Sequence, residues 1–151
     1  MRTFDSVAEL ADAVGETLGH SDWVTITQPE VNMFAEATGD YQWIHVDPER
    51  AAAGPFDGTI AHGYLTLALL PRLTHDIYSV KGVKLGINYG LNKVRFPSPV
   101  RVGSRVRATT TLLGLENIGT DAVQATMSTT VEIEGAAKPA CVAEHVVRYV
   151  I

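Results

Sequence analysis

Residues 64–70 read Tyr-Leu-Thr-Leu-Ala-Leu-Leu, and this stretch decides the fold class. It is apolar all round, so no helical phase can be read from it, but its length and leucine content favour a helix over a strand. A helix without a polar face belongs in a protein interior. Pro71 interrupts the stretch, and we expect a more polar helical continuation to about Val80.

Beyond residue 82 the apolar period changes from a helical one to two, which is typical of strands with one buried face. Turn-forming residues separate the alternating runs at 97–99, 114–119 and 135–139. The predicted strands cover residues 83–91, 105–112, 123–133 and 141–151.

Helix-start signals lie ahead of the apolar stretch. A Ser or Thr followed three residues later by Glu forms a capping box, and a glycine then ends the helix. The predicted helices are residues 6–15, opened by Ser6 and Glu9, residues 27–39, opened by Thr27 and Glu30, and a short helix capped by Asp47, with a strand at 22–26. Helices followed by long strands indicate an α+β domain. One helix without a polar face and about five strands predict a single hotdog domain over residues 1–151, in which an antiparallel sheet wraps around a central apolar helix. Periodicity alone also fits other α+β sandwiches.

Composition restricts the class of protein. Of 151 residues, 46% are hydrophobic and 19% charged, which is typical of a globular chain. No run approaches the ~18 apolar residues of a membrane span, and the start lacks the apolar run of a secretion signal. The single cysteine, Cys141, has no internal partner, which suits a reducing compartment. We therefore expect a cytoplasmic protein without a membrane partner, and the net charge of −5 argues against nucleic acid.

Chemistry is concentrated after the helix that Gly39 ends. Residues 39–45 read Gly-Asp-Tyr-Gln-Trp-Ile-His, which places the Asp40 carboxylate and the His45 imidazole five positions apart. Two such groups can converge on one water molecule and act as general acid and base. On spacing alone a structural explanation is favoured, in which Asp40 ends a helix and His45 is a hydrogen-bonded histidine.

This segment resembles the hydratase-2 motif of MaoC-like (R)-specific enoyl-CoA hydratases, roughly Gly-Asp-x-Asn-Pro-aliphatic-His. The matching positions are Gly39, Asp40, Ile44 and His45. Gln42 and Trp43 replace the usual Asn-Pro, as in relatives that resemble nodulation protein N. The resemblance implies that Asp40 and His45 form the catalytic dyad.

Two further segments carry the same resemblance. Residues 60–65, Ile-Ala-His-Gly-Tyr-Leu, lead into the apolar helix, and residues 95–103 match Arg-Phe-x-x-Pro-Val-x-x-Gly. A helix N-terminus presents free N–H groups, so the Gly63 N–H is a candidate donor to a thioester oxygen that gains negative charge. The alternative is that Gly63 only permits a tight turn. For His62 we expect a structural or supporting role.

The resemblance implies reversible hydration of a trans-2-enoyl-CoA to an (R)-3-hydroxyacyl-CoA, by a homodimer without cofactor or metal. Two alternatives stay open: a hotdog acyl-CoA thioesterase, and a non-catalytic acyl-CoA-binding protein. Basic residues of the third segment and the strand after it could bind CoA phosphates, although a solvated strand face is the commoner explanation. They are Lys93, Arg95, Arg101, Arg105 and Arg107.

Overall fold

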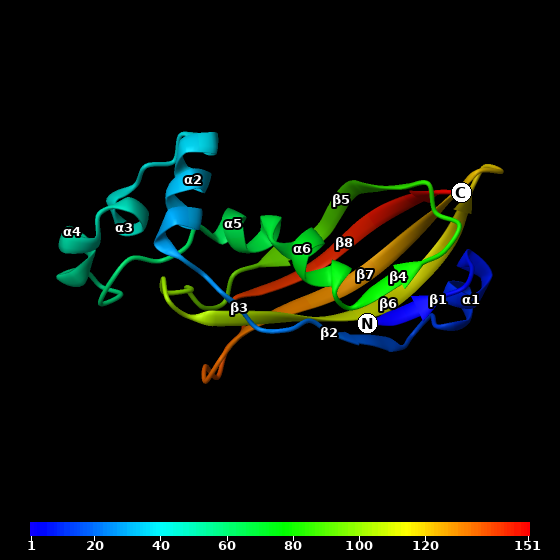
Figure 1. The fold of residues 1–151 in the computed structure, drawn as a ribbon, viewed down its shortest axis with the longest axis horizontal. Helices are drawn as coiled ribbons and strands as arrows, with labels where there is room; N and C mark the ends of the chain where they lie inside the picture. The colour runs from blue at the N-terminus through cyan, green and yellow to red at the C-terminus, as the bar shows by residue number, and fades with distance from the viewer.

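The computed structural model describes residues 1–151, and its main element is a six-stranded antiparallel sheet (Figure 1). The strand order is β2-β6-β7-β8-β5, and β3 also pairs with β6. The short strands are β2 (Thr17–His20) and β3 (Val24–Thr25). The long ones are β5 (Leu85–Arg95), β6 (Arg105–Ile118), β7 (Ala122–Ile133) and β8 (Cys141–Val150).

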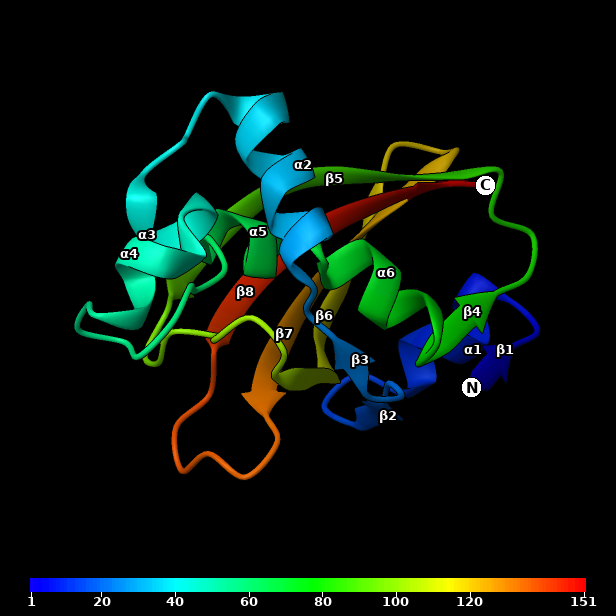
Figure 2. The same ribbon diagram turned by 60° about the vertical axis from the view of Figure 1, so that its left-hand side comes forward.

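Two short helices lie across one face of this sheet, α5 (Gly63–Ala68) and α6 (Leu70–His75) (Figure 2). Leu65, Leu70 and Leu73 of these helices are buried, and they belong to a core of 22 buried residues that includes Val106, Leu112 and Met127 from the sheet. The apolar stretch therefore forms the predicted central helix, and the expected hotdog arrangement is confirmed.

The length and burial of that helix differ from the prediction. The helix breaks at Leu69, resumes with Pro71 in the first turn of α6, and ends at His75. The expected helical continuation to Val80 is wrong, because residues 78–80 form β4 (Tyr78–Val80), which pairs in parallel with β1 (Arg2–Phe4). Such a pairing between distant segments leaves no local signal. Tyr64 is 72% exposed, so within a single chain this helix is not buried on every side.

The helix-start signals before the sheet are confirmed. They open α1 (Val7–Asp12), α2 (Gln28–Thr38) and α4 (Pro48–Ala52), while α3 (Trp43–Val46) was not predicted. The Thr27–Glu30 capping box forms in both directions, and Gly39 ends α2 with a φ of 77°, a left-handed conformation that suits glycine. The predicted strand at 22–26 is reduced to β3.

Strands β6 and β7 confirm the alternating pattern, with every second residue buried over most of their length. The third inner strand, β8, alternates only as far as His145, because Val146 and Val147 are buried as well. One predicted turn is wrong. Residues 114–118 continue β6 beyond a bulge between Leu112 and Gly114, and the chain reverses only after Ile118. The glycine at 114 marks the bulge rather than a turn.

Strand β5 departs most from its pattern. It is an edge strand that pairs only with β8, and its residues are exposed along both faces apart from the half-buried Val94. Its large apolar side chains Leu85, Ile87, Tyr89 and Leu91 are each about half exposed. The expected buried face is thus absent within one chain. Gly86, Asn88 and Gly90 line a hollow beside α5 and α6, and the large apolar side chains occupy the positions that alternate with them. No helix of the structure combines the length and apolar character of a membrane span.

Candidate active site

Asp40 lies directly after the glycine that ends α2. The left-handed turn at Gly39 is held by a 2.8 Å hydrogen bond from the Gly39 N–H to the carbonyl of Ala35. The Asp40 carboxylate accepts a 3.3 Å bond from the Gln42 N–H, which bends the chain toward α3. Asp40 itself is exposed. The carboxylate therefore stands at the surface, where a substrate can reach it.

His45, by contrast, is 6% exposed and lies within α3. Its Nδ1 is 2.7 Å from the carbonyl oxygen of Ile60. A carbonyl can only accept, so Nδ1 carries the hydrogen and Nε2 of the neutral ring is a free acceptor. The Gln28 side chain donates a 2.7 Å bond to the His45 carbonyl, and the Thr59 hydroxyl donates to Gln28. The backbone and the ring of His45 are both fixed.

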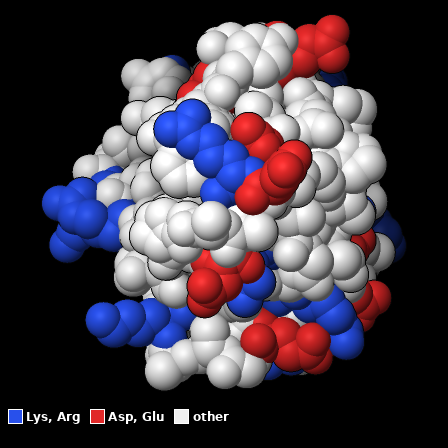
Figure 3. Space-filling model, turned by 90° about the vertical axis from the view of Figure 1, so that its left-hand side faces the viewer, with Lys and Arg blue, Asp and Glu red and all other residues white.

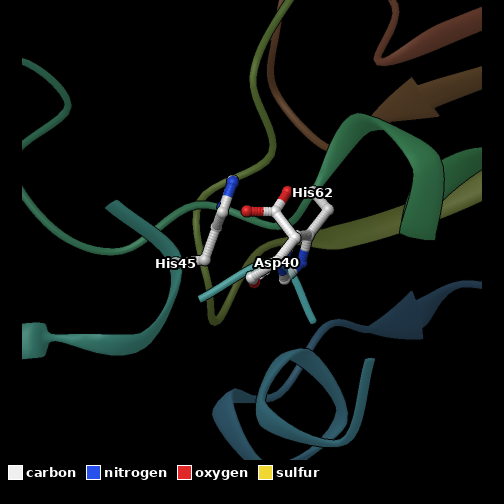
Figure 4. Close-up of side chains that lie close together, drawn as sticks. All are labelled: Asp40, His45 and His62. Atoms are coloured by element: carbon white, nitrogen blue, oxygen red, sulfur yellow. Dashed lines mark hydrogen bonds between the residues drawn. The ribbon is translucent and has the colours of Figure 1, made fainter. Parts of the chain in front are cut away.

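A third residue, His62, joins the predicted pair. One ligand-type atom from each of Asp40, His45 and His62 lies within 4.8 Å of the other two. Figure 4 shows the Asp40 carboxylate turned toward the His45 ring. These are side chains that can bind metal, and a catalytic zinc site takes three protein ligands. The rings of His45 and His62 are stacked with planes inclined by only 24°, however, so their in-plane lone pairs do not converge on one ion. The arrangement instead suits two groups that share one water molecule.

The charge state of His45 follows from its surroundings. Burial lowers its pKa below the ordinary 6.5, and the neighbouring His62 adds to this effect. The hydrogen bond to Ile60 and the charge of Asp40 act in the opposite direction. The net shift favours neutral imidazole, so at neutral pH the site holds an uncharged acceptor beside a carboxylate.

Gly63 is the first residue of α5 and is half buried. A Cβ added at this position would lie 3.1 Å from Cδ2 of Phe96, so the backbone passes directly against that ring. The first N–H groups of a helix have no partner within the helix. The Gly63 N–H can therefore serve a bound oxygen.

Backbone pairing brings the three motif segments together. The N–H of Ala61 donates to the carbonyl of Val100 at 2.8 Å, and the N–H of Val102 donates to Thr59 at 2.9 Å. Ile60, between them, holds the ring of His45. Segments that are forty residues apart in sequence thus form one structure around the dyad.

A groove of about 690 Å³ runs between α5–α6 and the strands β5 and β8. Its lining includes Leu67 and Ala68, which lie about one helical turn beyond Gly63 on α5, but not Gly63 or the dyad itself. Most of the lining is apolar, so the groove can hold an apolar group.

The basic residues are only partly available for phosphates. Arg105 and Arg107 pair with Glu134 and Glu132 and lie over the ring of Trp23. Arg101 donates to the Asp57 carbonyl and Arg95 to the carbonyl of the residue before it. On the face that carries α2–α4, Figure 3 shows cations mixed with acidic side chains rather than one continuous basic patch.

Comparisons with known proteins agree with this fold. Residues 9–134 match the family model described as MaoC like domain. The chain is 76% identical over 150 residues to 3-hydroxyacyl-thioester dehydratase Z of Mycobacterium tuberculosis, covering 99% of each. It is 44% identical over 143 residues to nodulation protein N of Rhizobium leguminosarum bv. viciae, covering 93% of this chain and 89% of the relative. The solved (R)-hydratase from A. caviae involved in PHA biosynthesis has a TM-score of 0.68 and 29% identity, over 85% of this chain and 93% of that one.

These matches define a hotdog protein of the hydratase and dehydratase class. The chain belongs to the MaoC-like dehydratase family. The resemblance seen in the sequence, including its nodulation protein N-like variant, is confirmed.

The sequence singled out His62 for a structural or supporting role but did not show that it contacts both members of the dyad. Sequence reasoning missed Phe96, which lies against Gly63. Both stand within the motif segments, but only the fold brings those segments together.

Proposed function

We propose that the chain is an (R)-specific enoyl-CoA hydratase that interconverts trans-2-enoyl and (R)-3-hydroxyacyl thioesters, with Asp40 and His45 as its dyad. The observation that carries this proposal is the position of an exposed carboxylate beside a neutral, tautomer-fixed imidazole. The names of the mycobacterial dehydratase and of the A. caviae (R)-hydratase support the same reaction, read in its two directions.

In the hydration direction, one water molecule binds between Asp40 and Nε2 of His45. The dyad takes one proton as the water oxygen bonds to the β-carbon, and the electron pair of the double bond moves toward the thioester oxygen. The Gly63 N–H stabilises the resulting enolate. A proton from the dyad then reaches the α-carbon, so that the elements of water are added overall.

The apolar groove between α5–α6 and the strands β5 and β8 is the proposed binding site for the acyl chain. With the carbonyl at Gly63, an acyl group can extend past Leu67 and Ala68 along the apolar lining. Burial of each CH₂ there contributes roughly 0.8 kcal/mol. The polar carrier end then lies on the side of the exposed Asp40.

The proposal includes a homodimer. A β-strand that is exposed on both faces and along one edge invites pairing with another chain. In β5 this edge carries four half-exposed large apolar side chains, which a second copy would cover. Self-pairing of the same surface is the rule in twofold dimers.

Incubation with crotonyl-CoA tests the function. We expect loss of the conjugated thioester absorbance and formation of 3-hydroxybutyryl-CoA without release of free thiol. Release of thiol would instead identify a thioesterase, and binding without turnover would identify a non-catalytic acyl-CoA-binding protein. Either of these results contradicts the proposal. Asp40→Asn, measured alongside, shows whether the turnover belongs to this site.

A further inference from the structure

His62 makes contacts with both members of the proposed dyad. Its Nε2 lies 2.9 Å from the backbone carbonyl oxygen of Asp40. Its ring stacks on the ring of His45, with centroids 3.8 Å apart and planes inclined by 24°. The same residue precedes Gly63 as the N-cap of α5. One side chain thus links the carboxylate loop, the imidazole and the helix N-terminus.

The ring of His62 is also enclosed from the other side. Phe34 of α2 lies against it, with centroids 4.9 Å apart, and His62 is only 2% exposed. Such packing leaves the ring little freedom to turn. The loop that carries Asp40 is otherwise exposed, so the bond from His62 is its connection to the interior.

The hydrogen bond to Asp40 determines which nitrogen of His62 donates. The Asp40 carbonyl only accepts, so Nε2 carries the hydrogen. The other nitrogen, Nδ1, is buried and has no hydrogen-bond partner. The contact with the Asp40 loop is therefore the hydrogen bond that this side chain makes.

We propose that His62 is a positioning residue, whose Nε2–H group holds the Asp40 loop against His45 in the geometry that hydration requires. The proposal rests on the proposed function only for its kinetic part. A displacement of about 1 Å in a reacting group can reduce a rate by about 10²-fold. Loss of the bond should therefore lower kcat far more than it changes KM.

Two substitutions separate the roles of the ring and the donor. His62→Phe keeps an aromatic ring between Phe34 and His45 but removes the N–H group. His62→Gln removes the ring but keeps an amide N–H of similar reach. We expect a fall in kcat with crotonyl-CoA of about 10- to 100-fold in the Phe variant, with KM changed less than about threefold, and a recovery of part of that loss in the Gln variant. Parent kcat in a folded Phe variant would overturn the proposal.

The pH profile supplies a readout that a purely structural residue would not change. His62 is one cause of the lowered pKa of His45, whereas the Asp40 charge and the Ile60 hydrogen bond act against it. Without His62 the pKa of His45 should rise, and the acid limb of the rate profile should move to higher pH. An unchanged limb in both variants would contradict the proposal.

Nitrogen NMR of the histidine rings tests the inference without any turnover. In the parent protein we expect Nε2 of His62 to carry a hydrogen that is bonded to the Asp40 carbonyl. A ring whose only hydrogen lies on Nδ1 would overturn the proposal whether or not the protein hydrates crotonyl-CoA. If the NMR result holds and the parent shows no hydration, the proposed function fails and the local arrangement stands.

Discussion

Nδ1 of His45 lies 2.7 Å from the carbonyl oxygen of Ile60, and this contact decides which nitrogen can do chemistry. The hydrogen is committed to Nδ1, so Nε2 remains as the acceptor beside Asp40. Burial keeps the ring neutral by lowering its pKa. The site therefore depends on a backbone carbonyl from the segment that also leads into Gly63.

The dyad gives the first prediction. Asp40→Asn and His45→Gln should each reduce turnover of crotonyl-CoA by ~10² or more, because each removes a positioned acid or base. Steady-state kinetics on purified proteins with parent-like thermal unfolding measure this. Asp12→Asn and His20→Gln, which alter exposed residues outside the site and the groove, serve as matched controls and should keep parent rates. Near-normal activity in either dyad variant would refute the assignment.

Gly63 gives the second prediction. Gly63→Val should reduce the hydration rate by ~10²–10³, the usual effect of a lost oxyanion donor. The structure adds a second cause, because even a Cβ would lie 3.1 Å from the Phe96 ring. Binding of a saturated acyl-CoA should persist in the variant. Parent-rate hydration in the folded protein would show that Gly63 only shapes the turn.

A companion variant tests the contact with Phe96. Gly63→Ala keeps the backbone N–H, as Gly63→Val does, but places only a Cβ against Phe96. If crowding matters, Phe96→Ala in the same chain should recover part of the rate that Gly63→Ala loses. No recovery would mean that the contact with Phe96 is not the cause.

The exposed strand β5 gives the third prediction. Light scattering at micromolar concentration should show a dimer or larger, because four large apolar side chains on this edge need cover. Ile87→Lys should weaken the assembly, whereas Leu113→Lys, at a similarly exposed apolar position on β6, should not. A parent protein that scatters only as one 16.3 kDa chain would refute the dimer.

Acid sensitivity gives the fourth prediction. Burial lowers the pKa of His45 and of His145, whose Nε2 lies 2.9 Å from the Thr129 hydroxyl. Between the folded pKa and the ordinary 6.5, the unfolded chain binds more protons than the folded one. The stability these residues contribute is therefore complete above the ordinary pKa and is lost as the pH falls through it.

Thermal unfolding between about pH 7.5 and about pH 5.5 measures this effect, since that range spans the ordinary histidine pKa. We expect the parent Tm to fall toward acid pH and His145→Gln to show a weaker dependence. The exposed His75→Gln should follow the parent curve. A parent Tm that does not fall would contradict the predicted role of the buried histidines.

Much of the fold could be predicted, because its signals are local. The capping box at Thr27, the glycine at 39 and the alternation in β6 and β7 depend on neighbouring residues and were confirmed. The pairing of β1 with β4 joins segments more than seventy residues apart and left no such signal. The exposure of β5 also escaped prediction, because periodicity shows which side chains share a face but not what covers it.

Part of the candidate site could also be predicted from local sequence, and part of it could not. Asp40, His45 and Gly63 follow from their motif segments, and the structure places the first two beside each other. For His62 the sequence indicated a structural or supporting role but not the contacts that define it. Its Nε2 lies near the backbone carbonyl of Asp40, twenty-two positions earlier, and a contact to a backbone atom leaves no pattern in the sequence.

The stereochemistry of the product tests the central claim most directly. Crotonyl-CoA should be incubated with the parent protein and with Asp40→Asn, and the 3-hydroxybutyryl-CoA formed should be assayed with dehydrogenases specific for each enantiomer. The account predicts the (R) product from the parent and at most about one hundredth of that rate from the variant. A predominantly (S) product, or equal rates from the two proteins, would contradict it.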